Sequence, residues 1–307
     1  MKIAILGAGA MGSLFGGRLK ASGVDVRLVD VWAEHIEAIN SKGLVVEQDG
    51  GRQIISIPAM LPAEADTVVD LVIVFTKSMH TEAALAGIRS MLSGRTHVMT
   101  LQNGIGHVDI IGRFVDRANI IHGITTYPSD LVGPGHIRTS GEGHIKFMSV
   151  DGRSHELLAR VDGMLKNAGL HSAVTPGAEV AIWEKLAFNA VMNALAAILR
   201  LKVGDVGDAA EGRQLAGRIV EEVVGVARKK GIGVNQQRIM ATLEMAFREH
   251  RDHMPSMLQD VLHKRPTEID FINGAVVQAG QAVGLSLPVN STLTLLMKIL
   301  EQAEIKS

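Results

Sequence analysis

The N-terminal half of the chain alternates short apolar runs with stretches of helical periodicity. Residues 2–6 are uniformly apolar after Lys2 and too few for a helix, so they predict a buried strand. A glycine-rich turn follows, then a helix predicted over 13–22 and a second strand over 26–30. The same reasoning predicts strands over 68–75, 96–101, 120–126 and 144–150, a hairpin-like segment over 133–143 and a helix over 156–168. This order predicts an α/β domain with a mainly parallel sheet.

The C-terminal half shows only helical periodicity. Gly231 and Gly284 follow apolar-periodic runs and are typical of helix C-termini. Helices are predicted over 178–200, 208–230, 235–249, 267–282 and 290–303. We expect a domain boundary near Pro176, which gives an α/β domain at 1–176 and an all-α domain at 177–307. A cleft between two such domains is a preferred place for a small-molecule site.

One predicted helix carries a polar stripe on an apolar background. Lys185, Asn189 and Asn193 are spaced at i, i+4 and i+8, which places them on one face. Leu, Ala, Phe, Val and Met surround them, so the helix is expected to be largely buried. Buried polar groups need partners, and a bound ligand can supply them. The alternative is that Lys185 extends its ammonium group to solvent.

The turn after the first strand has the pattern G-x-G-x-x-G, formed by Gly7, Ala8, Gly9, Ala10, Met11 and Gly12. Glycines let the backbone approach a pyrophosphate, and the helix N-terminus supplies N–H donors. The position between a strand and a helix makes this a Rossmann-type dinucleotide fingerprint, although the glycines can also serve helix–strand packing alone.

Asp30 stands 18 positions after Gly12, at the end of the second predicted strand. A carboxylate there accepts hydrogen bonds from ribose hydroxyls and repels a 2′-phosphate. Val31 and Trp32 offer no guanidinium group for that phosphate. Asp30 therefore favours NAD(H) over NADP(H); the alternative is a solvated acid at a strand end.

Three further residues follow predicted strands, where doubly wound sheets bind ligands. Lys77 is placed to reach the cofactor or to remain in solvent. Asn103 can reach the nicotinamide or a substrate carbonyl, or can simply form an Asn-Gly turn. Ser129 lies close after the strand predicted over 120–126.

Two more polar features lie in the helical half. Ser256 can cap a helix or bind a carboxylate. Thr267 can cap the helix predicted over 267–282, which would leave Glu268 and Asp270 in its first turn, where acids are favoured.

Composition narrows the classes of function. The net charge is −1 and no basic run stands out, which predicts neither nucleic-acid nor membrane binding. The chain has no cysteine, which rules out disulfides and zinc-thiolate sites, and no metal site is predicted. The apolar run after Lys185 contains two asparagines and is too short for a membrane span. We expect a soluble, cytoplasmic protein.

Taken together, these motifs resemble the ketopantoate reductase (2-dehydropantoate 2-reductase) family over the whole chain. The resemblance rests on the glycine fingerprint, the Lys77 strand end, Gln102-Asn-Gly104, the Lys185 stripe, Ser256-Met-Leu-Gln-Asp260 and Glu268-Ile-Asp-x-Ile-Asn-Gly274. The resemblance implies NADPH-dependent reduction of ketopantoate to pantoate, on the route to pantothenate and coenzyme A.

The resemblance also implies a role for each matching residue. Lys185 matches the family's proton donor, and Glu268 matches a cofactor-contacting residue that can keep the lysine charged. The positions that match substrate-binding residues are Asn103, Asn189, Asn193 and Ser256. The positions that match cofactor contacts, besides the glycine turn, are Lys77, Asn103, Ser129 and Glu268.

Two positions depart from the family pattern. NADP-using members often carry arginine after the second strand, where this chain has Asp30-Val31. A polar substrate-side position is Val203 here, which leaves room for another 2-keto acid. The alternatives are therefore a paralogous NAD-dependent 2-keto or hydroxy acid dehydrogenase, and a cofactor-sensing protein without catalysis. A homodimer through the helical domain is expected, because its helices are apolar on more than one face.

Overall fold

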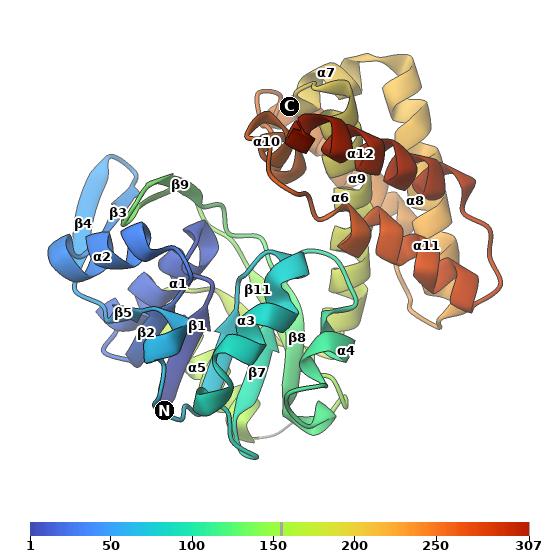
Figure 1. Cartoon of the computed structure of the whole chain (residues 1–307). Helices are drawn as coiled ribbons and strands as arrows, with labels where there is room; N and C mark the ends of the chain where they lie inside the picture. The colour runs from blue at the N-terminus through green and yellow to red at the C-terminus, as the bar shows by residue number, and fades with distance from the viewer. Residues whose placement is uncertain (154–155, 307) are drawn as a thin grey trace. The chain divides into compact units, whose positions relative to one another are not determined.

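The computed structural model describes residues 1–153 and 156–306, with side chains as far as Glu304. The chain forms two compact units. Unit 1 contains residues 1–102 and 107–178, and unit 2 contains residues 103–106 and 179–307. Figure 1 shows the elements of both units, each of which is described by itself.

Unit 1 is built on an eight-stranded sheet in the order β12-β11-β8-β7-β6-β1-β2-β5. Its strands are β1 (Lys2–Leu6), β2 (Asp25–Val29), β5 (Ala59–Met60), β6 (Leu71–Val74), β7 (His97–Thr100), β8 (Ile120–Thr125), β11 (Ile145–Ser149) and β12 (Ser172–Val174). Neighbouring strands from β5 to β8 are parallel, whereas β11 runs antiparallel to β8. The chain proceeds from β1 to β2 on one side and returns to β6 on the other. The sheet therefore has a topological switch point at β1 and β6, where such folds bind ligands.

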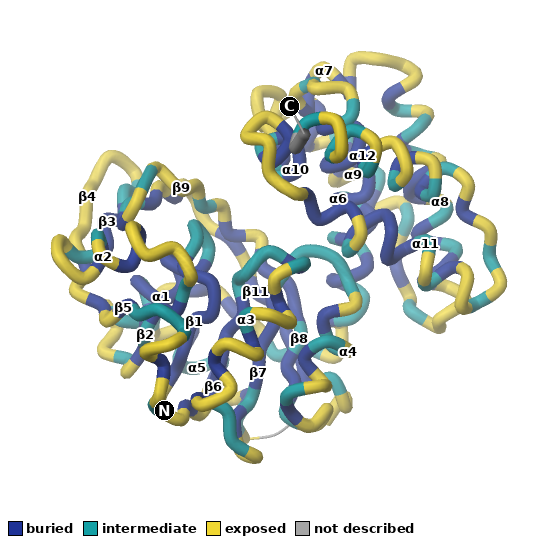
Figure 2. The backbone as a smooth tube through the Cα atoms, viewed as in Figure 1, coloured by how far each residue is buried: buried dark blue, intermediate teal, exposed yellow. Residues whose placement is uncertain are grey.

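Side-chain alternation along the central strand explains the two layers around this sheet. Ile3 and Ile5 of β1 enter one buried cluster, and Ala4 and Leu6 enter another. The helices of the first cluster are α1 (Ala10–Ala21), α2 (Ala33–Lys42) and α5 (Glu156–Asn167). Those of the second are α3 (Thr81–Gly87) and α4 (His107–Ile111). Because both faces are covered, the central strands β1 and β6 are almost entirely apolar and buried. The central part of the sheet is mainly dark blue in Figure 2.

A small second sheet, in the order β4-β3-β10-β9, completes unit 1. Its strands are β3 (Leu44–Gln48), β4 (Gly51–Ile55), β9 (Asp130–Gly133) and β10 (His136–Thr139). The helix α2 (Ala33–Lys42) precedes it. The predicted hairpin over 133–143 corresponds to β9 and β10, which pair antiparallel from residue 130 to residue 139. The elements of unit 1 that were not predicted are α2, α3, α4, β3, β4, β5 and β12.

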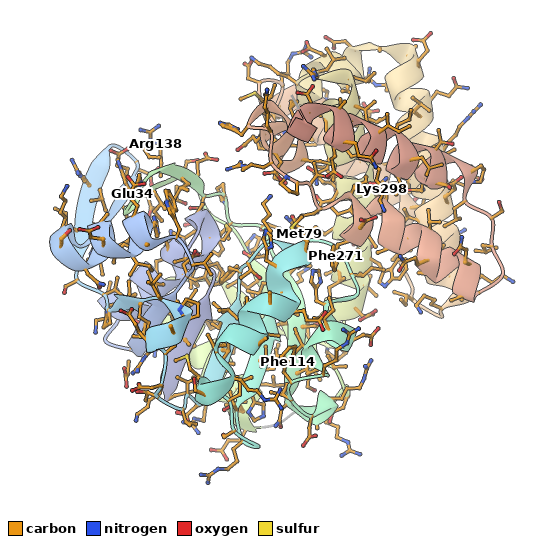
Figure 3. All side chains as sticks on the ribbon, in the orientation of Figure 1. Glu34, Met79, Phe114, Arg138, Phe271 and Lys298 are labelled. Carbon is orange, nitrogen blue, oxygen red and sulfur yellow. The ribbon has the colours of Figure 1, made fainter. Side chains whose placement is uncertain are left out.

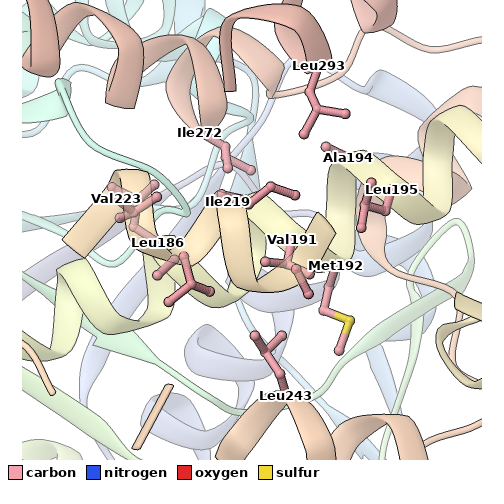
Figure 4. Close-up of a cluster of buried hydrophobic side chains, with 14 of the residues drawn as sticks. Leu186, Val191, Met192, Ala194, Leu195, Ile219, Val223, Leu243, Ile272 and Leu293 are labelled. Atoms are coloured by element: carbon pink, nitrogen blue, oxygen red, sulfur yellow. The ribbon is translucent and has the colours of Figure 1, made fainter. Parts of the chain in front are cut away.

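Unit 2 is helical apart from the segment 103–106. Its helices are α6 (Ala178–Leu199, whose first residue belongs to unit 1), α7 (Val203–Asp208), α8 (Ala210–Lys229), α9 (Gln236–Glu249), α10 (Ser256–Leu262), α11 (Asn273–Ala282) and α12 (Pro288–Lys306). The single-turn 3₁₀ elements of the chain are η1 (Pro62–Glu64), η2 (Ser78–His80), η3 (Arg89–Met91), η4 (Arg117–Asn119) and η5 (Ile269–Phe271). Figure 4 shows part of the core of unit 2, with Leu186 and Val191 of α6 among its labelled residues.

Two features of unit 2 differ from the prediction. The helix expected over 267–282 is divided into η5 and α11, because Ile272 has φ −105° and ψ −94°, outside the helical range. The short helix α7 was not predicted. The α/β domain followed by a helical domain is confirmed.

The helix α6 is the one described helix whose length and composition would allow it to cross a membrane. However, 72% of its most apolar window is buried within the fold. Its apolar surface is therefore explained by core packing, and no membrane is indicated.

Candidate active site

The glycine-rich turn of unit 1 has the close approaches that its pattern predicts. Gly7 has φ +94°, and a Cβ there would lie 2.5 Å from the amide nitrogen of Thr76, just after β6. At Gly12 a Cβ would lie 1.8 Å from the carbonyl oxygen of Gly7. Gly9 instead has no heavy atom within 4 Å of the Cβ position. Two glycines thus close the turn, whereas the third leaves open space beside the backbone.

This turn suits the pyrophosphate of a dinucleotide. The helix α1 begins at Ala10, so Ala10, Met11 and Gly12 form its first turn. Gly9 provides no side-chain cap, and that first turn contains no acidic residue. The amide groups and the positive end of the helix dipole are therefore available to an anion at the switch point of the sheet.

Asp30 contacts the glycine-rich turn directly. Its Oδ2 accepts a hydrogen bond from the Ala8 amide at 2.6 Å, and its Oδ1 accepts one from the Trp32 amide at 3.0 Å. Asp30 is therefore more than a solvated acid at a strand end. Each carboxylate oxygen can accept a further hydrogen bond, so ribose hydroxyls remain suitable partners.

The side chain of Gln102, for which the sequence predicted no role, joins the ends of β6 and β7. Gln102 Nε2 donates to the Thr76 carbonyl at 2.8 Å and to Thr81 Oγ1 at 2.9 Å. Lys77 follows Thr76, at the N-cap position of η2, and is half-buried. Gln102 thus fixes the backbone that carries Lys77.

Ser129 also lies against the glycine-rich turn, because its Oγ donates to the Ala10 carbonyl at 3.0 Å. A second support of this region, His35, had no sequence signal. Its Nδ1 accepts from the Gly135 amide at 3.0 Å, and its Nε2 lies 3.3 Å from Ser13 Oγ. Burial lowers the pKa of His35, although the Asp30 carboxylate opposes the decrease. The neutral ring therefore carries its proton on Nε2.

Asn103 belongs to unit 2, together with the turn that follows it. Gly104 has φ +90°, and a Cβ there would lie 2.2 Å from the carbonyl oxygen of Phe271. The Ile105 amide donates to the same oxygen at 3.0 Å. Asn103 is thus followed by a glycine turn, as the alternative interpretation held. That turn is anchored three residues from Glu268 in sequence.

The polar stripe of α6 is present as predicted. Asn189 is 9% exposed and Asn193 is 4% exposed. Within residues 1–153 and 156–306, neither asparagine side chain has a hydrogen-bond partner. Their amide atoms are not among the fully enclosed unpaired atoms of the described residues, so both keep access to solvent or to a ligand. Two such asparagines on one helix face are the features expected of a wall that binds a polar ligand.

Lys185 lies one helical turn before Asn189 and is half-buried. Burial lowers the pKa of Lys185 to about 8, and the Glu268 carboxylate opposes this decrease. Glu268 itself is 6% exposed. It stands at the N-cap position of η5 and not in the first turn of a long helix, so the helix-dipole explanation for this acid is wrong. A lysine with such a pKa can donate a proton near neutral pH.

The surroundings of Glu268 show which neighbouring residues are structural. Thr267 Oγ1 accepts from the Ile269 amide at 3.3 Å, so this hydroxyl caps the start of η5. Asp270 pairs with Lys298 at 2.7 Å on the surface; Lys298 is labelled on α12 in Figure 3. Asp270 is therefore a surface residue, whereas Glu268 is buried.

Ser256 does not have the environment of a helix cap, and Val203 does not have that of a residue that lines a pocket. Ser256 is the first residue of α10, whose N-cap is Pro255, so it does not act as a helix cap. It is half-buried and remains suited to bind a ligand. Val203 is 2% exposed and belongs to the hydrophobic core of unit 2. The interpretation of Val203 as a position facing the substrate is therefore not supported by its burial.

Two family models match the chain. The model described as "Ketopantoate reductase PanE/ApbA" matches residues 3–152. The model described as "Ketopantoate reductase PanE/ApbA C terminal" matches residues 178–301.

The chain is also similar to individual proteins over nearly its whole length. A 2-dehydropantoate 2-reductase of Streptococcus pyogenes serotype M3 is 34% identical, with 96% of each chain covered. A solved structure of D-mandelate dehydrogenase with NADH and anilino(oxo)acetate is 36% identical, with 99% of each chain covered and a TM-score of 0.94. The 2-dehydropantoate 2-reductase of Geobacter metallireducens is 29% identical, covers 99% of this chain and 100% of its own, and has a TM-score of 0.91. With a fingerprint turn in unit 1 and a lysine–asparagine stripe in unit 2, the chain belongs to the ketopantoate reductase family of oxidoreductases.

Proposed function

We propose that this protein reduces 2-dehydropantoate to pantoate with a nicotinamide cofactor, in the synthesis of pantothenate and coenzyme A. The observation that supports the substrate site best is the pair of buried asparagines, Asn189 and Asn193, with no partner within the described residues. A substrate with a carboxylate and a hydroxyl group would supply acceptors and donors for both amides. The name of the relative from Streptococcus pyogenes supports the same substrate.

The chemistry proposed for Lys185 follows from its environment. When bound, the nicotinamide supplies a hydride to the ketone carbon. Negative charge then develops on the carbonyl oxygen, and the Lys185 ammonium stabilises it and donates a proton to it. The Glu268 carboxylate favours the charged form of Lys185, because it opposes the effect of burial on the lysine pKa. Asn103, Asn189, Asn193 and Ser256 are proposed to bind and orient the substrate.

The glycine turn from Gly7 to Gly12 is proposed to bind the cofactor pyrophosphate, with Lys77, Ser129 and Glu268 as further cofactor contacts. Within this site Asp30 favours NADH. Its carboxylate holds the turn through the Ala8 amide, so a negative charge is fixed beside the expected ribose position. A 2′-phosphate would be repelled there. The D-mandelate dehydrogenase structures hold NADH, which supports this choice for a similar chain.

The second candidate is a dehydrogenase for a different 2-keto or hydroxy acid. The observation that favours it is the likeness to D-mandelate dehydrogenase, which is at least as strong as the likeness to the named reductases. Both candidates share the Lys185 chemistry and differ in the group attached to the keto acid. A cofactor-sensing protein is less well supported, because Lys185 and Glu268 are both present and close enough to interact.

A steady-state screen distinguishes these candidates. Ketopantoate, benzoylformate and small aliphatic 2-keto acids are each offered with NADH and NADPH. A kcat/KM for ketopantoate above that of every other acid supports the proposal, and a clear preference for benzoylformate would replace it with the second candidate. Loss of Lys185 (Lys185→Ala) should lower kcat roughly 100-fold or more while cofactor binding persists. Unchanged turnover in that variant would exclude the assigned role.

We also propose that the protein is a cytoplasmic homodimer formed through unit 2. As far as Glu304, where the description of side chains ends, the exposed positions of α12 carry no charge; they are Pro288, Thr292, Leu295, Leu296, Ile299, Gln302 and Ala303. Leu295 is 61% exposed and Ile299 is 64% exposed, which is unusual for such large apolar side chains on one helix. A face without charges can meet its own copy across a two-fold axis without like-charge repulsion. The chain has no cysteine, which suits a reducing compartment.

A further inference from the structure

A buried chain of polar groups connects four helices of unit 2. Glu222 of α8 accepts a hydrogen bond from Asn290 Nδ2 at 2.7 Å. Asn290 Oδ1 accepts from Asn273 Nδ2 at 3.0 Å, and Asn273 Nδ2 also donates to the Ala190 carbonyl of α6 at 3.0 Å. Both asparagines are fully buried. Each member lies on a different helix, so the polar groups are brought together by the packing of the helices and not by local structure.

The carboxylate at one end determines the direction of every bond in this chain. Glu222 also accepts from the Val289 and Asn290 amides at 2.8 and 2.9 Å, so as a carboxylate it acts only as an acceptor. Asn290 must therefore present its NH₂ group to Glu222 and its oxygen to Asn273. Asn273 in turn must present its NH₂ group, and the second hydrogen of that group reaches the Ala190 carbonyl.

This orientation leaves one buried atom unpaired. Asn273 Oδ1 has no hydrogen-bond partner within the part of the chain that the structure describes. An apolar residue would remove this unpaired oxygen, but it would also leave the buried Asn290 Oδ1 without its donor, so Asn273 and Asn290 depend on each other.

The hydrogen bond from Asn273 to the Ala190 carbonyl connects two segments that carry residues of the proposed site. Ala190 is the residue after Asn189, on the stretch of α6 that leads to Asn193. Glu268 begins a tight turn, because its carbonyl accepts from the Phe271 and Ile272 amides at 3.0 and 3.1 Å. Asn273 follows that turn immediately, so one side chain connects the Glu268 turn to the helix of the polar stripe.

We propose that Asn273 is a positioning residue for the reaction, which holds the Glu268 turn against α6 in an orientation set by Glu222 and Asn290. The inference rests on the proposed function, since it takes the α6 stripe as the substrate site. Without the contact, the turn keeps its hydrogen bonds to Glu301 and Ile105 but loses its link to α6, so Glu268 is held less firmly beside Lys185. Glu268 is the charged group that acts on Lys185, so its displacement must change how Lys185 titrates.

The direct test is to titrate Lys185 in the Asn273→Ala variant. Lysine labelled with ¹³C at Cε is followed by NMR, and the Lys185 signal is identified by its absence in Lys185→Arg. We expect the pKa of Lys185 to fall below its wild-type value of about 8, because the carboxylate that raises it is held less firmly nearby. In steady-state assays kcat should fall roughly 10- to 100-fold, as expected when catalytic groups are displaced by about 1 Å.

A matched control separates positioning from general loss of stability. Met297 is fully buried in the same core, on the helix that carries Asn290. Met297→Ala should lower the melting temperature but leave the Lys185 titration unchanged. Should Asn273→Ala not fold, Asn290→Ala removes the acceptor that orients Asn273, and it should lower the Lys185 pKa to a smaller extent.

An unchanged Lys185 titration in a folded Asn273→Ala or Asn290→Ala protein would overturn the inference. This result is independent of the proposed function, because the NMR titration requires no turnover. Full activity of Lys185→Ala would instead overturn the proposed role of Lys185. The NMR titration would still decide whether Asn273 holds Glu268 near this lysine.

Discussion

The charge of one lysine is set by two opposing effects in unit 2. Burial removes water from the Lys185 ammonium and lowers its pKa to about 8, while Glu268 favours the charged form. The result is a group that is still protonated at neutral pH but can release its proton readily. An exposed lysine would be a much weaker acid and an inefficient donor.

The pH dependence of the reaction should report this balance. If Lys185 is the proton donor, as proposed, reduction requires its protonated form, so kcat/KM should be level below the lysine pKa of about 8 and should fall about tenfold per pH unit above it. Glu268→Gln removes the charge that raises this pKa, so the basic limb should move to lower pH. The measurement is kcat/KM for reduction between pH 6 and pH 10.

Glu184→Gln provides the control, since it removes a carboxylate from the neighbouring position of α6. Glu184 pairs with Arg238 and has no effect on the lysine pKa. Its profile should match the wild type, and a shift as large as that of Glu268→Gln would contradict the specific role of Glu268.

Two glycines with similar backbones should respond differently to a methyl group. Gly104 and Gly106 have φ +90° and +100°, so alanine is strained at both, by about 1–3 kcal/mol. Only at Gly104 would the Cβ also meet a carbonyl oxygen, that of Phe271, at 2.2 Å, whereas Gly106 has nothing within 4 Å. Thermal melts should therefore show a larger loss for Gly104→Ala than for Gly106→Ala. Equal losses would mean that the Phe271 contact does not restrict the turn.

At the scale of helices and strands, α12 has one face in the core and one uncharged face in solvent. Its charged residues at the border are already engaged: Lys298 pairs with Asp270, Glu301 accepts from the Thr267 amide and Glu304 pairs with Arg200. The exposed stripe between them is therefore left with only apolar and uncharged polar groups. Such a face can be explained by contact with a second copy.

Charges placed on this stripe should separate the proposed dimer. Sedimentation equilibrium of wild-type protein is expected to give twice the chain mass, and Leu295→Glu combined with Ile299→Glu should give the mass of one chain. Val68→Glu, at an exposed apolar position of unit 1, should keep the dimer. A wild-type protein that is monomeric at all concentrations tested would refute the assembly.

The elements that the sequence predicted are those with a strong local pattern. Short, mainly apolar runs indicated the buried strands β1, β6 and β7, and the i, i+4, i+8 spacing placed the α6 stripe on one helix. The strand β4 was missed because four of its five residues are exposed, so it has no apolar run. The break at Ile272 was missed because neither proline nor glycine stands there, and the turn depends on contacts to distant residues.

The residues of the proposed site were likewise predictable only where a local sequence pattern marked them. The side chains proposed to face the substrate appeared in the sequence as polar exceptions on an apolar helix. Their supports were not visible: Asn273 bonds to a carbonyl 83 positions away in sequence, and Asn290 to a carboxylate 68 positions away. Such partners are brought together only by the fold.

At the scale of the whole molecule, each unit has its own hydrophobic core and its own tryptophan. Trp32 of unit 1 is partly exposed and stacks on His35, with ring centroids 5.0 Å apart. Trp183 of unit 2 is buried, and its indole nitrogen donates to Glu179. Fluorescence can therefore report on the two units separately.

Oxidised cofactor should stabilise unit 1 selectively. In Trp183→Phe the urea unfolding midpoint seen by Trp32 should rise with added NAD⁺, by the equivalent of about 2.7 kcal/mol at a hundredfold excess over Kd. In Trp32→Phe the midpoint seen by Trp183 should change less. Equal shifts of both signals would show that the two units unfold as one.

The choice between NADH and NADPH is also expected to depend on contacts that form only in the folded protein. Fluorescence titration should show NADH binding at least as tightly as NADPH, because Asp30 is held beside the fingerprint turn by the Ala8 amide. Asp30→Asn should reduce the difference between the NADH and NADPH affinities, because it weakens the repulsion of a 2′-phosphate. A clear NADPH preference in the wild type would refute the argument from Asp30.

The chain passes between the two units more than once, because the segment 103–106 belongs to unit 2 although the residues on both sides of it belong to unit 1. The chain leaves unit 1 after Gln102, contributes four residues to unit 2 and returns at His107, long before the main transition at residue 178. A fragment ending at residue 178 would carry the Ile105 amide without the Phe271 carbonyl that accepts from it. The two units are therefore not interchangeable modules, and a chimaera joined only near residue 178 would need compatible sequences at both 103–106 and 271 to fold.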